Sequence, residues 1–304
     1  MQILITGATG LIGRALASDL LARGDEVVAI SRDASRAALA LPDDAEILEA
    51  DVTQPGPWLD RAQVADAVVN LVGENIGEGI WWTGGKRRAM RRSRLRPTSL
   101  LADAMREREH PGVLINASAT GYYGDAGERP LPETAEPGGD FLAMLTYEWE
   151  RHALRAESER CRVVCARFSP VLAAEGGMLP KLEPVFRKGL GGRLGSGRQY
   201  WPWIHRRDAV RALQFALDTP ALRGPMNVCT PNPPTQGEFA RFLADTLDRP
   251  ARLPAPAWAL RLLLGEKGTM LLASQRALPN QLKSHGFRWE YAELDRALAD
   301  LVSA

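Results

Sequence analysis

The sequence predicts an α/β fold in which a doubly wound parallel sheet carries helices on both faces. Short apolar runs alternate with longer segments of helical spacing, and several runs are apolar throughout, as in strands covered on both sides. The predicted strands are residues 2–6, 26–30, 46–50, 67–71, 113–117 and 162–168.

Helical spacing covers residues 11–23, 87–106 and 141–157 between these strands. Pro97 should kink or split the second of these helices, because proline has no backbone N–H. Beyond about residue 170 the pattern loosens, and helical spacing returns at 208–218, 236–247, 258–264 and 293–302.

This change of pattern indicates how the domains are organised. We expect residues 1–170 to form a Rossmann domain, with segments around 205–230 returning to it. Residues 171–304 should form mainly a smaller substrate lobe, in which 250–304 are a small C-terminal domain. The lobe should sit at the carboxyl edge of the sheet, where ligands of such folds bind.

Composition excludes several classes of protein. A chain of 304 residues, 45% of them hydrophobic, can form a large core, and a net charge of +1 does not favour nucleic acid or a membrane surface. We find neither a signal sequence nor an apolar run of about 18 residues. Cys161, Cys165 and Cys229 are too scattered for a disulfide framework and fit a reduced compartment. We therefore expect a cytoplasmic monomer or homodimer that binds small molecules.

The loop Gly7-Ala8-Thr9-Gly10-Leu11-Ile12-Gly13 predicts a dinucleotide site. It follows a strand and opens an amphipathic helix, whose first amides can face a pyrophosphate. Gly7 permits the turn, Gly10 leaves room for phosphate, and Gly13 lets helix and strand approach closely. The alternative is a structural turn without a ligand.

Residues after the second and third strands bear on the choice of cofactor. An NAD site usually has an acid at the end of the second strand, whereas this chain has Ser31-Arg32-Asp33. Arg32 can pair with a 2′-phosphate, which favours NADP, unless it is only a solvated surface residue. Asp33 keeps NAD as the less favoured alternative. Asp51 and Val52 suit the adenine, although Asp51 could equally cap a turn.

Five motifs give the chain a family resemblance: GATGLIG at 7–13, ADVT at 50–53, NLVGE at 70–74, SATGYYG at 118–124 and ARFSPVL at 166–172. Together they resemble the extended short-chain dehydrogenases/reductases of the NAD(P)-dependent epimerase/dehydratase type. Further stretches resemble the sugar-nucleotide-epimerase-like subgroup with a small C-terminal domain of unknown function: Trp82 through Lys86 to Ser93-Arg94, then 195–210, and 253–266 with 274–287. The resemblance implies a Rossmann domain, NADP and a cytoplasmic location.

The resemblance also implies a catalytic set that this chain has only in part. Extended members use a Ser or Thr to hold the substrate oxygen, a Tyr to move the proton, and a Lys four residues later. Ser118 fits the first role, but no tyrosine here has a lysine four residues on. With Glu150 as the anchor, Leu142 stands at the Tyr position and Thr146 at the Lys position.

Three groups could replace the missing acid/base. Tyr123 follows Ser118 closely, although it could instead pack in the core or against substrate. Tyr147 with Arg151 has the lost spacing, with arginine in place of lysine, but is out of register with the family's position. Lys86 opens a strongly basic helix that could also be a solvated face.

The remaining candidates would line the cleft. Glu74 could bind a substrate hydroxyl or act as a base, or it could be a surface acid. Trp201 and Trp203 could form a stacking platform or pack in the core, and His205 is more readily a structural residue bonded to Asp208 than a base. We see no metal-binding set. The further cofactor contacts expected are Leu71, Val72, Gly73, Glu74, Arg94, Ala117, Arg167 and Phe168.

These features predict an NADP-binding oxidoreductase or epimerase for a small polar substrate, a sugar nucleotide among the candidates. The alternative is a protein that binds or senses NADP without turnover, which the missing Tyr–Lys pair favours.

Overall fold

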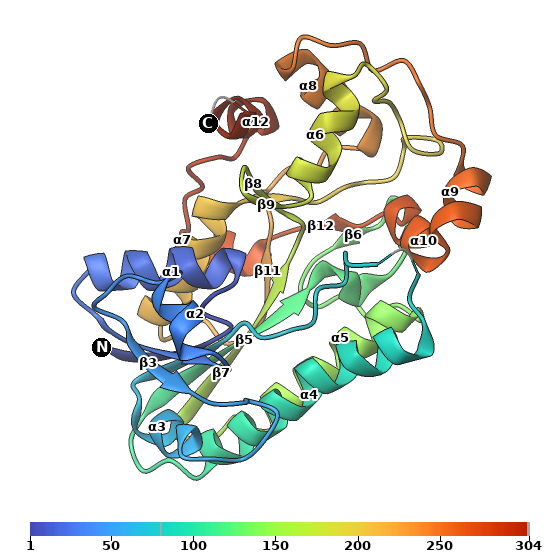
Figure 1. The fold of residues 1–304 in the computed structure, drawn as a ribbon. Coiled ribbons are helices and arrows are strands. Elements are labelled where there is room, and N and C mark those ends of the chain that lie inside the picture. The colour runs from blue at the N-terminus through green and yellow to red at the C-terminus, as the bar shows by residue number, and fades with distance from the viewer. Residues whose placement is uncertain (80, 303–304) are drawn as a thin grey trace.

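The computed structural model describes residues 1–79 and 81–302, and a parallel sheet forms its centre (Figure 1). Within those residues the sheet has the strand order β11-β7-β5-β4-β1-β2-β3. The strands are β1 (Gln2–Thr6), β2 (Glu26–Ser31), β3 (Glu46–Glu49), β4 (Ala67–Asn70), β5 (Gly112–Ala119), β7 (Cys161–Phe168) and β11 (Gly224–Val228). The order reverses between β1 and β4, which is where ligands of doubly wound sheets bind.

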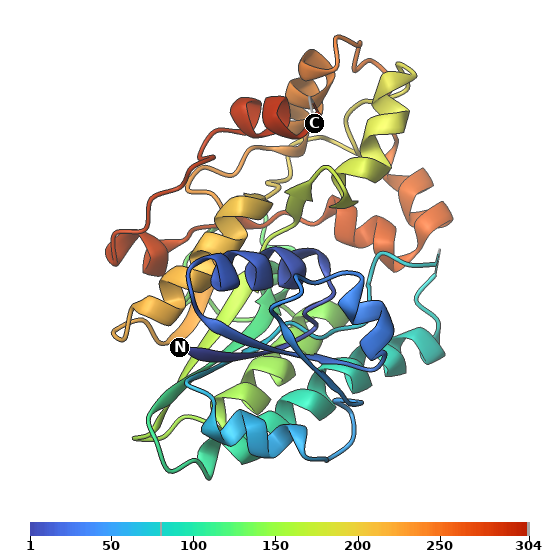
Figure 2. The same cartoon turned by 60° about the vertical axis from the view of Figure 1, so that its left-hand side comes forward.

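Helices cover both faces of this sheet (Figure 2). One face packs against α1 (Leu11–Ala22), α2 (Ala34–Ala38) and α7 (Arg206–Asp218), whose apolar residues form one core cluster. The other face packs against α3 (Trp58–Val64), α4 (Gly84–Arg106) and α5 (Phe141–Leu154), which share a second cluster. The predicted doubly wound α/β fold is therefore confirmed.

The smaller lobe has its own apolar core. It is built from β8 (Val171–Ala173), β9 (Gly176–Gly177), β10 (Ile204–His205), α6 (Leu179–Arg187), α8 (Gln236–Thr246) and α12 (Leu294–Val302). In α8 the cap is a reciprocal box: the Thr235 side chain accepts from the Glu238 amide, and the Glu238 side chain accepts from the Thr235 amide.

The C-terminal segment runs back to the Rossmann domain. After α9 (Ala257–Leu264) and α10 (Glu266–Leu272), strand β12 (Arg276–Ala277) pairs in parallel with β6 (Pro130–Leu131). Helix α11 (Asn280–Ser284) then lies against β11, and Leu282 and Phe287 join the core beneath α1 and α7. No described helix meets the length and apolarity needed to cross a bilayer.

Two differences from the sequence prediction concern helix α4 and the main sheet. Pro97 was expected to kink or split its helix and does not split it: α4 continues through Pro97, which is buried, as are Met90 before it and Leu101 after it. Packing on both sides of the proline compensates for the single hydrogen bond that it removes. Strand β11 lies within the segment around 205–230 that was expected to return to the Rossmann domain, but no strand was placed there, because Gly224, Pro225 and Asn227 are typical of turns. It lies at the edge of the sheet, where proline is tolerated.

Candidate cofactor and active site

The turn between β1 and α1 has the geometry of a phosphate-binding loop. Gly7 has φ of +72°, and a Cβ there would lie 2.9 Å from the Leu71 carbonyl carbon. A Cβ on Gly13 would lie 2.3 Å from the Gly7 oxygen, so only glycine lets α1 approach the strand this closely. Gly10 is the exposed N-cap of α1 without a side-chain cap, and a Cβ there would meet the Gly7 oxygen at 3.2 Å and no other atom within 4 Å. Space beside the first amides of α1 is therefore open to an anion.

After β2, Asp33 has a structural role in the turn, whereas Arg32 is exposed. Asp33 caps α2 and accepts from the Arg36 amide at 2.8 Å, while Ser31 Oγ donates to the Asp33 carbonyl at 3.0 Å. The Asp33 carboxylate is thus engaged in the structure of the turn, whereas Arg32 is exposed to solvent.

Asp51 and Val52 follow β3 with different surroundings. Asp51 Oδ1 accepts from the Thr53 amide at 2.9 Å and from its hydroxyl at 2.8 Å. The backbone hydrogen bond from Thr53 is the main cause of a lowered Asp51 pKa, and the charges of Arg32 and Arg92 add to it. Asp51 caps a turn, as one of the two interpretations proposed, and its exposed carboxylate lies near Arg32. Val52 is buried in the core.

A buried amide network fixes the carboxyl ends of the central strands. Thr6 Oγ1 donates to Asn70 Oδ1 at 2.6 Å, and Asn70 Nδ2 donates to Asn116 Oδ1 at 2.6 Å. Since these three residues lie on β1, β4 and β5, the backbone that leaves each strand is held in register.

The segment after β4 is held by Arg94 of α4. A Cβ on Gly73 would lie 3.1 Å from the Arg94 Cζ atom, so glycine lets the guanidinium pack on the backbone. Arg94 donates to the Glu74 carbonyl at 3.0 Å and lies 5.2 Å from the Trp149 ring centroid. Burial lowers the pKa of Arg94 to about 10. These contacts hold the backbone at Gly73 and Glu74.

Glu74 and Lys86 form an ion pair at this edge of the sheet. Lys86 Nζ donates to Glu74 Oε1 at 2.7 Å, and it lies 3.8 Å from Glu78 Oε2. The Lys86 side chain is 17% exposed and that of Glu74 38%, so both remain reachable from solvent. Thr83 caps α4: its side chain accepts a hydrogen bond from the Lys86 amide. This bond holds the backbone of Lys86 in the first turn of the helix.

Ser118 and Arg167 meet in a buried network around Glu150. Ser118 Oγ donates to Glu150 Oε1 at 2.6 Å. Arg167 forms a fork with the same carboxylate, with Nε to Oε1 and Nη2 to Oε2 both at 2.7 Å. The side chains of Arg167 and Glu150 are 3% and 6% exposed. The Ala117 and Phe168 candidates flank this network on β5 and β7.

Tyr123 belongs to the same network. Its hydroxyl donates to Asn227 Oδ1 at 2.8 Å and accepts from Arg167 Nη1 at 2.8 Å. Burial is the main cause of a raised Tyr123 pKa, which the charge of Arg167 offsets only in part. The phenol is therefore a neutral group at physiological pH.

Neither position aligned with the missing Tyr–Lys pair offers a comparable group: Leu142 is apolar, and the Thr146 hydroxyl bonds within its own helix. Leu142 packs in a cluster with Ile76, Trp82 and Met270. Thr146 Oγ1 donates to the Leu142 carbonyl at 2.7 Å within α5. Tyr147 packs beside Tyr122, with the Arg151 guanidinium 5.8 Å from its ring.

Two aromatic candidates of the lobe are structural. Trp201 and Trp203 are 9% and 1% exposed in the lobe core, as the packing interpretation expected.

His205 has different partners from those expected: it caps α7 through Nδ1, stacks on Tyr291 and lies 3.3 Å from Asp300. The expected bond from His205 to Asp208 is wrong, because the Asp208 carboxylate accepts from the Glu290 and Tyr291 amides instead.

The sequence did not reveal three residues that form hydrogen bonds with the predicted site residues. Glu150 served only as an alignment anchor, although it binds both Ser118 and Arg167. Asn227 and Glu133 were missed because their segments look like turns. In the described part of the chain, no group of three or more His, Cys, Asp or Glu side chains could hold a metal.

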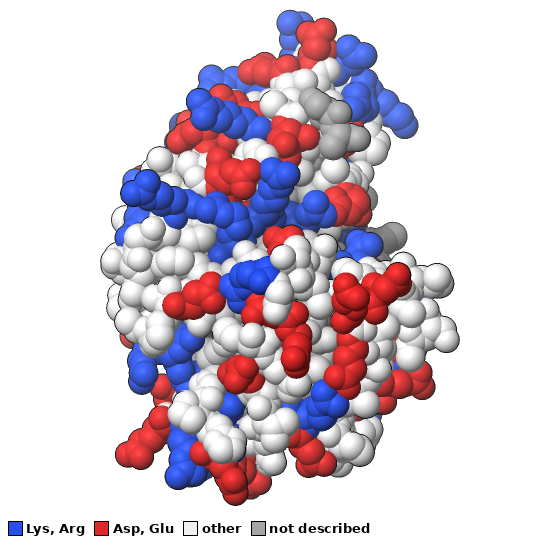
Figure 3. All heavy atoms as spheres, turned by 90° about the vertical axis from the view of Figure 1, so that its left-hand side faces the viewer, with Lys and Arg blue, Asp and Glu red and all other residues white. Residues whose placement is uncertain are grey.

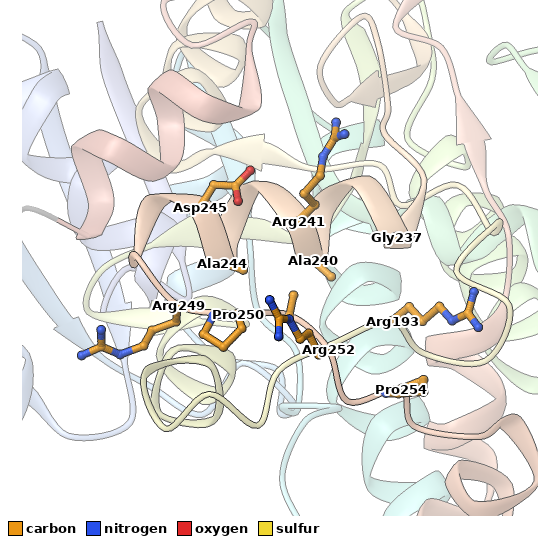
Figure 4. A pocket seen from close by; sticks show the side chains of 11 residues that line it. Arg193, Gly237, Ala240, Arg241, Ala244, Asp245, Arg249, Pro250, Arg252 and Pro254 are labelled. Carbon is orange, nitrogen blue, oxygen red and sulfur yellow. The ribbon is translucent and has the colours of Figure 1, made fainter.

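A surface hollow of about 510 Å³ lies elsewhere, beside α8 (Figure 4). It is lined by Arg193, Arg249 and Arg252 among others, but by none of the predicted site residues. The arginine side chains point in different directions in Figure 4, so they do not converge on one ligand.

Figure 3 shows acidic and basic side chains mixed over another face, apart from a basic band across its middle.

Comparisons with known proteins cover the whole chain. An epimerase family protein, SH2119 of Staphylococcus haemolyticus, is 37% identical over 100% of this chain and 99% of its own. The crystal structure of human epimerase family protein SDR39U1 (isoform 2) with NADPH has a TM-score of 0.85 and 31% identity, covering 100% of this chain and 99% of that one. A nucleoside-diphosphate sugar epimerase from Corynebacterium glutamicum has a TM-score of 0.80 and 30% identity, covering 99% of this chain and 58% of that one.

Family models divide the chain into two parts. Residues 255–301 match a domain of unknown function, DUF1731, and residues 3–229 match the NAD dependent epimerase/dehydratase family. The two matches agree with the predicted resemblance and with the fold. The chain belongs to the NAD dependent epimerase/dehydratase family.

Proposed function

We propose that this protein binds NADP and moves a hydride to or from a carbon of a small polar substrate, as an oxidoreductase or epimerase. The observation that carries the proposal is the bare N-terminus of α1 between Gly7, Gly10 and Gly13. The human relative crystallised with NADPH supports the choice of cofactor. The name of the Corynebacterium structure supports a nucleoside-diphosphate sugar as one candidate substrate. Three free, buried cysteines fit the cytoplasmic location that we also propose.

The residues of this chain fit each part of the dinucleotide. The amides opening α1 would bind the pyrophosphate, with Thr9, Leu11 and Ile12 around it. Arg32 would bind the 2′-phosphate, and Asp51 with Val52 would contact the adenine. Leu71, Val72 and Gly73 would lie along the nicotinamide ribose, with Ala117 and Phe168 beyond. When bound, the nicotinamide supplies or accepts the hydride.

We assign the proton transfer to Glu74 and Lys86. Lys86 can donate a proton to the substrate oxygen when a carbonyl is reduced, and accept it when an alcohol is oxidised. Glu74 orients the amine from 2.7 Å. Tyr123 is less suited, because its hydroxyl is engaged by Asn227 and Arg167 and its pKa is raised.

One observation favours a second function, the binding of NADP without turnover. Leu142 occupies the position of the family tyrosine and packs in an apolar cluster. Hydride exchange from isotopically labelled NADPH into a panel of carbonyl compounds distinguishes the two functions. Tight NADPH binding with no exchange into any class would establish the non-catalytic protein.

Lys86→Met should lower hydride exchange by about 100-fold or more, the usual contribution of a general acid/base. NADPH affinity, measured by fluorescence titration, should change less than about threefold, because Lys86 is assigned to the substrate. Arg88→Met is the matched control: Arg88 is an exposed residue of the same helix. Equal exchange rates in the two variants would remove Lys86 from the mechanism, and Tyr123→Phe would then be the variant to compare.

Arg32→Ala should weaken NADPH binding by about tenfold or more and leave NADH binding nearly unchanged. The variant loses a charge-assisted hydrogen bond to the 2′-phosphate, worth about 1.5–3 kcal/mol. Titration of both nucleotides measures the ratio. An equal loss for NADPH and NADH would show that Arg32 does not read the 2′-phosphate.

A further inference from the structure

Three lysines from different parts of the fold converge on the loop of residues 74–79. Lys86 comes from α4 of the Rossmann domain, Lys181 from α6 of the lobe, and Lys267 from α10 of the C-terminal segment. Lys267 Nζ donates to the Glu78 carbonyl at 2.8 Å and also to the Gly79 carbonyl. Lys181 Nζ donates to the Gly77 carbonyl at 3.3 Å. Carbonyls of three successive residues thus place the amines of Lys181 and Lys267 close together.

The positive charge of this lysine cluster exceeds the negative charge beside it. Glu74 and Glu78 are the carboxylates that approach Lys86, at 2.7 and 3.8 Å. The neighbouring Arg87 is paired with Glu266. Burial lowers the pKa of Lys267, and the charges of Lys181 and Lys86 lower it further. The three amines therefore repel one another in the absence of a further anion.

Unused N–H donors of these lysines also favour a further anion at the cluster. An ammonium group has three N–H donors. Within the described residues, Lys267 uses two on backbone carbonyls and Lys181 uses one. The Lys181 amine lies close over Gly77, where a Cβ would stand 2.9 Å from its Nζ atom.

The cluster also lies beside the proposed site of reaction. The loop of residues 74–79 directly continues the Leu71–Gly73 backbone assigned to the nicotinamide ribose. Ile76, within the loop, packs in one cluster with Leu142 of α5 and Met270 of α10. An anionic group bound by the lysines would thus place the rest of a small substrate next to Glu74 and Lys86.

We propose that Lys181 and Lys267, with Lys86 beside them, bind a phosphate group of the substrate at the loop of residues 74–79. Lysine is a common phosphate ligand that acts as a compact point charge, and three amines from separate elements suit a multiply charged phosphate better than a singly charged carboxylate. The inference rests on the proposed function and adds the chemical class of the substrate.

The test is titration calorimetry of the NADPH-saturated protein with inorganic pyrophosphate, and with acetate as the carboxylate arm. Saturation with NADPH fills the phosphate sites assigned to the cofactor, and the lysine variants below identify the part of the pyrophosphate signal that comes from the cluster. Pyrophosphate should bind, more weakly as salt is raised, and acetate should not. Lys181→Gln and Lys267→Gln should each weaken pyrophosphate binding about tenfold, while Lys188→Gln, at the exposed end of α6, should not.

The outcomes separate the two proposals. Failure of NADPH to bind would overturn the proposed function itself. Normal NADPH binding without pyrophosphate binding, or with equal binding to the Lys181→Gln variant, would overturn only this inference. Lys181 is exposed, so its replacement leaves the fold intact even if Lys267→Gln loosens α10. Acetate binding as tight as pyrophosphate would assign the cluster to carboxylates instead.

Discussion

Replacing Gly10 by alanine should lower NADPH affinity by more than about 100-fold while the protein stays folded. The added methyl group would stand over the first amides of α1 and would keep the pyrophosphate from at least two of them. Each lost hydrogen bond to an ionised phosphate is worth about 1.5–3 kcal/mol, and two exceed a factor of 100 in affinity. In the protein itself the methyl carbon would meet only the Gly7 oxygen, at 3.2 Å, within a 4 Å radius.

Gly139→Ala is the matched control for that variant. Its Cβ would have no heavy atom within 4 Å, and its backbone is not in the left-handed region. Fluorescence titration gives the NADPH affinity of both variants, and thermal unfolding shows that both are folded. A Gly10→Ala variant that binds NADPH as tightly as Gly139→Ala does would contradict the assigned phosphate loop.

Arg167→Met should lower the free energy of unfolding by about 3–5 kcal/mol, the largest change that we expect from a single polar side chain. The substitution leaves the Glu150 carboxylate buried without its fork partner, and uncompensated buried charge has that cost. It also removes the donor to Tyr123 and to the Glu133 carbonyl. Urea unfolding measures the difference.

A surface pair provides the comparison. Arg155 lies 2.6 Å from Asp103, and both side chains are about half exposed, at 49% and 54%. Arg155→Met should cost less than about 1 kcal/mol, because water screens the pair. The double variant Arg167→Met/Glu150→Leu should recover much of the stability lost in Arg167→Met, since no buried charge then remains. Similar losses for Arg167→Met and Arg155→Met would show that the buried pair is not a structural centre.

The sequence was sufficient for features that depend on local chemistry. Apolar runs placed β1, β2, β4 and β7 to within one residue at either end, and the glycine spacing located the turn whose geometry admits only glycine at residues 7 and 13. Glu74 and Lys86 were both candidates before the structure showed that they contact each other.

Features that depend on distant partners could not be predicted. Ser118 faces Glu150, 32 residues away, and Tyr123 faces Asn227, 104 residues away, so no spacing rule connects them. His205 was paired with the neighbouring Asp208, yet the fold brings Asp300 to its ring. Lys181 and Lys267 carry no motif of their own, and only the docking of α6 and α10 on the 74–79 loop brings their amines together.

The return of the C-terminal segment to the sheet has a consequence for how this architecture is inherited. The match to DUF1731 covers residues 255–301. Within it, Leu282 and Phe287 fill the core under α1 and α7, while Leu298 of α12 fills the lobe core. Asn227 of β11 donates to the carbonyls of Leu131, in the Rossmann domain, and Leu278, in the C-terminal segment, and so connects these two parts of the chain. Removing this segment would expose both cores to water. We therefore expect the Rossmann domain and the C-terminal segment to unfold in one cooperative transition, and we expect the two to occur together in related proteins.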